Sequence, residues 1–244
     1  MNTFFTTSDN IQHIIKSFNL TKTLFVSSIL IGEAHTGKKS LARHLFPDAY
    51  LVSCENQKAV EEAFEMYDEL IITDFELLSN PSSLNFDNKR IIATANFEGN
   101  KTLIDDLFAF IYTMPSLDER PEDVEYLITL FVKEACSTLQ IDKNTIETSM
   151  IPFDLSTNTQ SLKKSIYLYL TKLSMRKEDI ETLIYAYFLE HLNGNDGYRQ
   201  HLKLYEKPLI EAGLKKFGSQ LQLSQVLGIN RNTLRKKIHE HNIH

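Results

Sequence analysis

The sequence predicts an α/β protein, with a parallel sheet in its N-terminal half and helices alone in its C-terminal half. Two observations predict this class. Short apolar runs alternate with stretches of helical apolar spacing as far as residue 114, and no convincing strand follows Arg120. Strands that are interleaved with helices and joined by short turns favour a parallel sheet.

The predicted elements follow one another regularly. A helix is expected over 11–18, and a second over 38–46 after a turn at 32–37. Buried strands are expected at 24–31, 50–53, 70–73, 90–95 and 110–114. Amphipathic helices are expected over 122–139, 161–173, 177–192 and 198–217, with joints at 156–159 and 194–197. Apolar spacing of 3.6 residues predicts the helices, and compact apolar runs predict the strands.

Composition excludes several classes of protein. Of 244 residues, 42% are hydrophobic and 24% charged, as in an ordinary soluble globular protein. Cys54 and Cys136 form neither a disulfide framework nor a metal-ligand pattern, so no metal site is expected. No apolar run is long enough to span a membrane, and no signal peptide is evident, so we expect a cytoplasmic protein with no membrane partner.

The formal net charge of −6 conceals an uneven distribution. Residues 199–244 hold nine Lys or Arg and only three Glu, whereas residues 1–198 hold 17 basic and 29 acidic residues. A basic end on an acidic body is typical of an appended DNA-binding unit. A basic, solvated helix face is the alternative that charge alone leaves open.

The C-terminal residues predict a helix-turn-helix. Gly218 ends one helix, Ser219 caps a short helix, Gly228 makes the turn, and Asn230 caps a last helix from Arg231 to about 239. Seven apolar residues are expected to pack these helices together: Leu214, Leu223, Val226, Leu227, Ile229, Leu234 and Ile238. The outer face of the last helix then carries Arg231, Asn232, Arg235 and Lys236. A helix that reads DNA needs such side chains for base edges and phosphates.

The string from Leu227 to Lys237, LGINRNTLRKK, closely resembles the Fis-type helix-turn-helix. The resemblance covers residues 205–244 and implies DNA contacts by Asn230, Arg231, Thr233, Arg235 and Lys236, with Ser219 near the DNA backbone. It also implies a homodimer on palindromic double-stranded sites, formed through the preceding helices. The candidate interface residues are Ile184, Tyr187, Phe188, Leu202, Leu204, Leu209 and Ile210. The alternative is that these apolar residues only form core within one chain.

The N-terminal half contains an approximate phosphate-binding loop at residues 32–40, GEAHTGKKS. A strand precedes it and a helix follows, so backbone amides are expected to face phosphates, with Lys38 reaching the outer ones. Lys39 stands where the strict pattern has Ser or Thr. The candidate nucleotide-binding residues are Gly32, Thr36, Gly37, Lys38, Lys39 and Asp74.

Three further segments resemble the AAA+ domain of NtrC-type regulators. They are the loop with Leu41-Ala42-Arg43, the strand 90–96 (RIIATAN), and 117–124 (LDERPEDV), which leads into a helical lid in that family. A Fis-type helix-turn-helix follows the lid there, so the order of parts agrees. The resemblance implies an AAA+-like domain over 1–116, a lid over 117–175, and dimerisation helices with the helix-turn-helix over 176–244.

The departures from this family concern catalysis. Asp74 keeps the acid of the second nucleotide motif, but Phe75 replaces the catalytic carboxylate, and Glu76 is expected on the opposite side of a strand. Ile104 and Phe110 replace arginine fingers, and Gln160 replaces the sensor arginine of the lid. His35 replaces a loop glycine at a position where a Cβ is poorly tolerated. Loss of one arginine finger slows phosphoryl transfer by about 10³–10⁵-fold. Because several catalytic groups are replaced together, we expect no ATP hydrolysis and name no catalytic residues.

These observations predict a sequence-specific transcriptional regulator with a degenerate AAA+-like body. No cofactor is firmly indicated, and binding of ATP or ADP without turnover remains open. Only 35 residues separate Lys38 from Asp74, too few for the family's sigma-54 loop, so we expect no sigma-54 contact, although RNA polymerase remains a candidate partner. The alternatives are an active AAA+ ring that works on transcription or DNA, and a nucleoid-type architectural protein.

Overall fold

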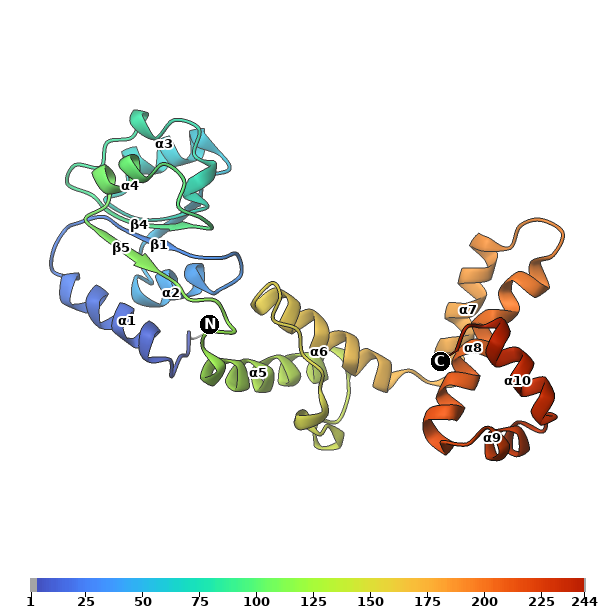
Figure 1. Ribbon diagram of the computed structural model, residues 1–244. Coiled ribbons are helices and arrows are strands. Elements are labelled where there is room, and N and C mark those ends of the chain that lie inside the picture. Colours follow the sequence, from blue (N-terminus) through green and yellow to red (C-terminus); the bar gives the residue numbers. More distant parts are fainter. Residues whose placement is uncertain (1–3, 244) are drawn as a thin grey trace. The chain divides into compact units, whose positions relative to one another are not determined.

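The computed structural model describes residues 4–243, apart from the side chain of residue 145. The chain divides into two compact units, Met1–Met175 and Arg176–His244. The first unit contains a sheet and its helices, and the second is all helical (Figure 1). Among the described residues, no helix combines the length and the apolar character needed to cross a membrane.

The first unit is built on five parallel strands in the order β2-β3-β4-β1-β5. Their bounds are β1 Ser28–Ile31, β2 Tyr50–Ser53, β3 Glu69–Thr73, β4 Arg90–Ala95 and β5 Phe110–Thr113. The predicted α/β class is therefore confirmed. The first strand is shorter than predicted, because a turn closed by the Leu24 amide and the Thr21 carbonyl leaves Leu24 and Phe25 half-exposed.

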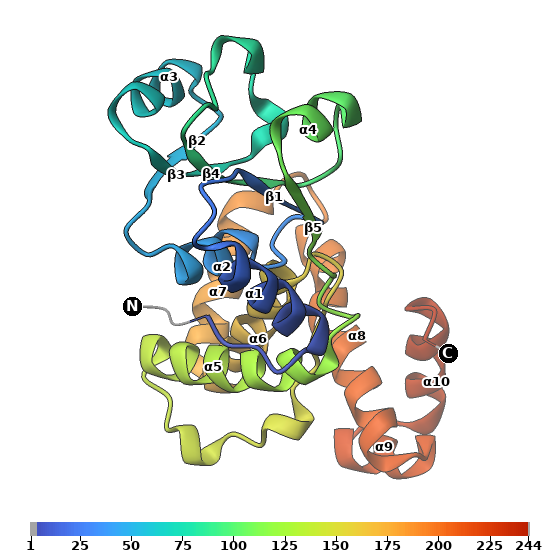
Figure 2. The same cartoon turned by 90° about the vertical axis from the view of Figure 1, so that its left-hand side faces the viewer.

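Helices cover both faces of this sheet (Figure 2). Helices α1 (Asp9–Thr21) and α2 (Lys38–Leu45) cover one face, and α3 (Gln57–Met66) and α4 (Lys101–Leu107) cover the other. Within β3, Leu70 and Ile72 pack with the second pair of helices while Ile71 packs with the first. This alternation explains why the strands are apolar without interruption: a strand that is covered on both faces has no polar side.

Helices α3 and α4 were not among the predicted elements. Each is short, and each begins at an asparagine whose side-chain oxygen accepts a hydrogen bond from the amide three residues on. The bonds are Asn56 to the Ala59 amide at 3.2 Å and Asn100 to the Leu103 amide at 3.3 Å. Such caps stabilise a helix start by about 1 kcal/mol. The two asparagines were therefore the local sequence feature from which these helices could have been predicted.

The segment predicted as a lid, here called the lid, contains two long helices, α5 (Pro121–Leu139) and α6 (Thr159–Ser174). They bury an apolar core of their own, centred on Val132, Cys136 and Ile166. Between the helices, residues 140–158 contain only two single 3-10 turns, Lys143–Thr145 and Thr148–Met150. One side of α5 is therefore covered by an irregular segment instead of a helix.

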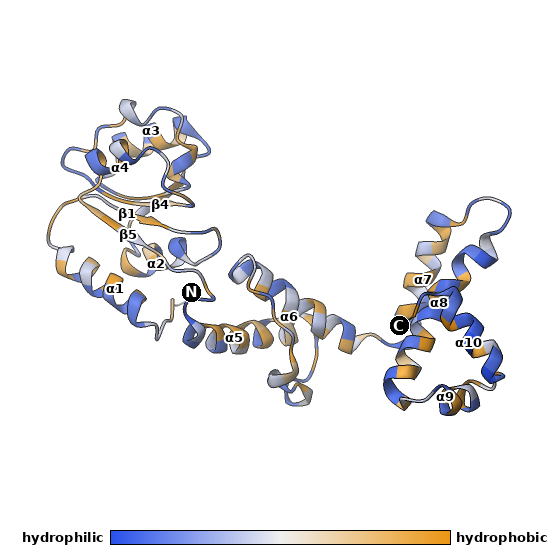
Figure 3. Cartoon of the chain, viewed as in Figure 1, coloured by the Kyte–Doolittle hydropathy of each residue, from blue (hydrophilic) through white to orange (hydrophobic). Residues whose placement is uncertain are grey.

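The second unit consists of four helices, α7 (Lys177–His191), α8 (Gly197–Phe217), α9 (Gln220–Leu227) and α10 (Arg231–Glu240). Its core is small: Ile210, Leu223 and Leu234 are the fully buried apolar residues. Gly213 allows α8 to approach α9, because a Cβ there would clash with the Leu223 side chain. Figure 3 shows apolar residues along α7 and mainly polar ones on α10.

Candidate functional site

Helices α9 and α10 form a helix-turn-helix with a cap at each start. The Ser219 hydroxyl accepts a hydrogen bond from the Gln222 amide at 3.5 Å, and the Asn230 side chain accepts one from the Asn232 amide at 2.8 Å. Gly228 forms the turn with a φ of 64°, a left-handed conformation that glycine adopts without steric cost. The local sequence therefore determines both helix starts and the turn between them.

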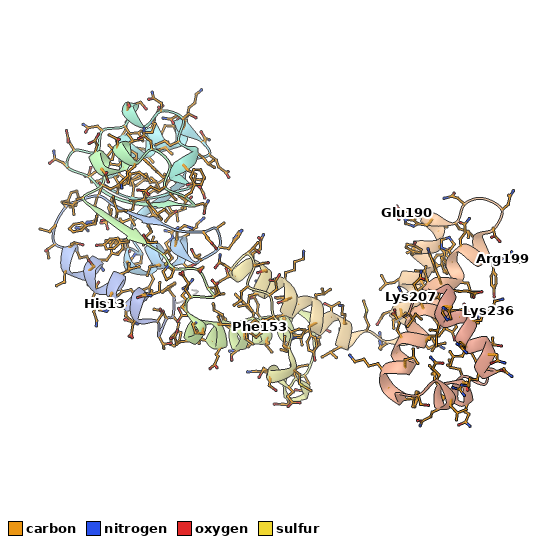
Figure 4. All side chains as sticks on the ribbon, in the orientation of Figure 1. His13, Phe153, Glu190, Arg199, Lys207 and Lys236 are labelled. Carbon is orange, nitrogen blue, oxygen red and sulfur yellow. The ribbon has the colours of Figure 1, made fainter. Side chains whose placement is uncertain are left out.

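The exposed face of α10 carries the residues predicted to contact DNA. Arg231, Asn232, Thr233, Arg235 and Lys236 are all exposed, whereas Leu234 between them is completely buried. Lys236 is labelled on this helix in Figure 4. Burial of Leu234 fixes the rotation of α10, and this rotation places the basic side chains in solvent. The capping side chains of Ser219 and Asn230 lie at the starts of the two helices.

Two predictions about apolar residues of this unit were wrong. Val226 was expected in the core but is 57% exposed, because Leu223 and Leu227 form the core face of α9. Ile210 was expected in a dimer interface but is only 2% exposed, packed with Leu223 and Leu234. The apolar pattern identified both as packing residues without showing which surface each would face.

A charged cluster fastens α10 to α8. Glu206 on α8 accepts hydrogen bonds from Lys237 and from the His241 ring, the latter at 3.0 Å. These bonds hold the pKa of the Glu206 carboxyl below its usual value, with Lys237 as the largest cause. Lys237 therefore supports the fold, although it stands in the basic run beside Arg235 and Lys236. No local pattern predicts this ion pair, because its two residues are 31 positions apart in the chain.

The candidate nucleotide loop lines a cavity of about 380 Å³. Its walls include His35, Gly37, Lys38, Lys39, Thr73, Asp74, Asn96 and Thr159. The Lys38 ammonium lies inward and donates to the carbonyls of Gly32 at 2.8 Å and Glu33 at 2.6 Å, and to the Asn96 side chain at 3.2 Å. Burial lowers the pKa of Lys38 to about 8. A phosphate that binds the Lys38 ammonium would have to replace its hydrogen bonds to the Gly32 and Glu33 carbonyls.

Residues of the lid bind the remaining carbonyls of the loop. Asn158 donates to the Ala34 carbonyl at 3.1 Å and to the Glu33 carboxylate at 3.0 Å. The Thr159 amide and hydroxyl donate to the His35 carbonyl at 3.2 and 2.7 Å. Arg120 donates to the Thr36 carbonyl. These hydrogen bonds hold the loop, and each joins residues more than 80 positions apart in the chain. The sequence analysis did not predict them.

Two residues that line the cavity, His35 and Asp74, have a left-handed backbone conformation. His35 has a φ of 61° and is exposed, so the replacement of glycine is accommodated with backbone strain. Asp74 has a φ of 59° and turns the chain out of β3 into a 3-10 turn over Phe75–Leu77. Glu76 therefore does not lie in a strand, which corrects the prediction. Its carboxylate accepts from the Asn96 amide at 3.1 Å and side chain at 2.6 Å.

The four positions predicted to lack catalytic side chains lie in different surroundings. Phe75 is 5% exposed and packs edge-on against Phe108. Ile104 is 2% exposed in the core on the α3–α4 face of the sheet, and Phe110 is half-buried in β5. Gln160 is exposed near the start of α6. Glu76 is not among the residues that line the cavity. The Glu76 carboxylate is instead hydrogen-bonded to Asn96, which does line the cavity.

Residues 202–241 match the model of the family described as bacterial regulatory protein, Fis family. A relative in Pseudomonas aeruginosa, described as a Fis-like DNA-binding protein, is 35% identical over 71 residues, which are 28% of this chain and 67% of the relative. The chain belongs to the Fis family. The predicted Fis-type helix-turn-helix is thereby confirmed, and its helices are α9 and α10.

Two further similarities are to proteins named NtrC and NtrX. The DNA-binding transcriptional regulator NtrC of Azospirillum brasilense is 42% identical over 65 residues, 25% of this chain but only 14% of that relative. The crystal structure of NtrX from Brucella abortus in complex with ATP has a TM-score of 0.53 at 15% identity, covering 100% of this chain and 70% of that one. At this identity the likeness concerns the fold alone, and it agrees with the predicted α/β sheet followed by helices.

Proposed function

We propose that this Fis-family chain is a sequence-specific DNA-binding transcriptional regulator that reads DNA with α10. The observation that carries the proposal is the exposed set of Arg231, Asn232, Arg235 and Lys236 beside the fully buried Leu234. Arginine and asparagine read guanine and adenine edges by paired hydrogen bonds in the major groove, and lysine binds phosphates. The match to the Fis family supports the same assignment.

We further propose that α7 mediates a homodimer. None of its side chains is buried, although it carries Ile180, Leu183, Ile184, Tyr187 and Leu189, all at least 41% exposed. A second copy of this chain, packed on α7, would remove this apolar surface from water. A two-fold dimer presents two copies of α10 to half-sites about one DNA turn apart, so palindromic operators are expected.

The AAA+-like body is proposed to act without ATP hydrolysis. Two arginine-finger positions are apolar, the sensor position is Gln160, and Glu76 is bound to Asn96. Phosphoryl transfer depends on such charges to stabilise its transition state. Gly37, Lys38 and Asp74 remain at the cavity, so binding of ATP or ADP without turnover fits the residues present. RNA polymerase is a candidate partner, and no contact with sigma-54 is proposed.

Arg235→Ala is expected to weaken DNA binding by about 1–3 kcal/mol, or roughly five- to 150-fold, because a paired contact to a base is lost. The measurement is fluorescence anisotropy with a site taken from genomic footprinting and with a scrambled duplex. The loss should be larger on the site. Arg199→Ala is the matched control: Arg199 is exposed near the start of α8, about 27 Å along that helix from its end at the motif.

Undiminished affinity of Arg235→Ala for its site would contradict the assignment of α10 as the reading helix. Footprints spread evenly over a genome, instead of a few palindromes, would favour the architectural alternative.

Phosphate release from ATP is expected to be no faster with the wild-type chain than with Lys38→Ala, with or without DNA. The missing charges would otherwise supply several orders of magnitude in rate. Hydrolysis that depends on DNA and disappears in Lys38→Ala would overturn the proposal and favour an active ring. Lys39→Ala is the control for a general loss of positive charge at the loop.

A further inference from the structure

The lid contains a second cavity, of about 570 Å³, that is separate from the nucleotide loop. It lies between the first half of α5 and residues 148–155, and its apolar walls include Leu117, Pro121, Val124, Ile128, Ile151 and Phe153. Phe153, labelled in Figure 4, is 52% exposed. The volume lies within the range of about 300–1,000 Å³ that is common for small-molecule sites.

The cavity follows from how α5 is covered. Pro121, Val124, Glu125 and Ile128 recur at helical spacing and form one face of α5. The segment opposite this face is a single 3-10 turn followed by chain without regular secondary structure, as far as Leu155. It contributes Ile151 to the core of the lid but leaves Phe153 partly in solvent. An apolar face on α5 therefore lines a hollow instead of packing against another helix.

The charged groups that line this cavity are both acids. Asp118 and Glu125 supply two exposed carboxylates, and Thr129, Thr148 and Ser149 supply hydroxyls. No Lys, Arg or His lines the cavity, and within residues 4–243 neither carboxylate has an ion-pair partner. The matching ligand has an apolar body for the walls and a positive group for the two acids.

We propose that the lid cavity binds a small organic cation, an amine on an aromatic or branched aliphatic body. The site is distinct from the DNA-reading helix and from the nucleotide loop, and it gives the lid a ligand of its own. The apolar walls supply affinity, and the carboxylates of Asp118 and Glu125 select the charge.

Hydrogen bonds connect this cavity to the nucleotide loop. The amide of Leu117, a cavity residue, donates to the Asn158 side chain at 2.7 Å. The Asn158 amide in turn donates to the carbonyl of Leu155, another cavity residue, at 2.9 Å. Asn158 is 2% exposed and binds the Ala34 carbonyl and the Glu33 carboxylate. A ligand that holds Leu117 and Leu155 in place therefore also steadies the loop over 33–36.

The test uses three probes of similar shape on the full chain: 2-phenylethylamine, 2-phenylethanol and phenylacetate. Binding is followed by protein-observed NMR. The amine is expected to bind with a Kd of about 1 mM, as befits its size, and the alcohol and the anion at least tenfold more weakly. Hydrogen exchange of residues 33–36 should slow when the amine is bound.

Two surface substitutions test the selection of charge without disturbing the core. Asp118→Asn combined with Glu125→Gln should reduce affinity for the amine to that for the alcohol. Glu122→Gln, on the same helix but outside the cavity lining, is the matched control and should change nothing. Equal binding of the three probes, amine affinity unchanged in the double variant, or no binding of the amine would each overturn the proposal.

Discussion

Arg120→Ala is expected to lower the free energy of unfolding of the first unit by about 3–5 kcal/mol. Arg120 and Asp123 are 3% and 2% exposed and lie 3.3 Å apart. The Asp123 carboxylate also accepts from the Thr6 hydroxyl and the Thr7 amide. Removing the guanidinium leaves a buried carboxylate without its cation and releases the Thr36 carbonyl of the nucleotide loop. The N-terminal segment, the lid and the loop all meet at this ion pair.

Hydrogen exchange detected by mass spectrometry measures this effect, because the slow amides of β1 and β4 report the opening of the sheet separately from the second unit. Lys163→Ala is the matched control, since its ion pair with Glu134 is 43% and 47% exposed and such pairs contribute at most about 1 kcal/mol. Arg120→Met with Asp123→Leu should recover part of the loss. Equal exchange in Arg120→Ala and Lys163→Ala would show that the buried ion pair does not support the fold.

Leu234→Ala is expected to destabilise the helix-turn-helix by about 2–5 kcal/mol. Leu234 is completely buried, and it is one of three apolar residues that make up the buried core of the second unit. A cavity in so small a core cannot be filled by neighbours that are themselves half-exposed. DNA binding should therefore be lost together with helical circular dichroism, whereas Arg235→Ala should lose affinity and keep its helices.

Val226→Ala is the matched control for this prediction. Val226 belongs to the same motif but is 57% exposed, so its truncation should change stability by no more than about 0.5 kcal/mol. Equal losses from Leu234→Ala and Val226→Ala would mean that α9 and α10 pack differently from the arrangement described.

Local features were predicted from the sequence because neighbours in the chain determine them. The starts of α9 and α10 depend on Ser219 and Asn230, whose side chains bond to amides two or three residues on. Strand β4 was predicted with its exact bounds, since its apolar run is covered on both faces. The residues of α10 that were predicted to contact DNA are exposed to solvent. Helical spacing predicts this, because it places Leu234 on the buried face and these residues on the other faces.

Features that depend on distant segments could not be predicted in this way. Which of Val226 and Ile210 would be buried was decided by how α8, α9 and α10 pack. The position of Glu76 was decided by the left-handed conformation of Asp74, which ends β3 and brings Glu76 to Asn96. The 3.6-residue spacing shows that a residue packs, but it does not identify the partner surface.

The sequence by itself determined the class of fold, the order of its parts and the Fis-type motif, because each is encoded in contiguous residues. Only the tertiary structure decided which groups surround the nucleotide loop and which line the lid cavity. Arg120 reaches the Thr36 carbonyl across 84 residues, and Asn158 reaches Ala34 across 124. Such contacts form where separate helices and loops converge, and their geometry depends on the whole packed unit instead of any local pattern.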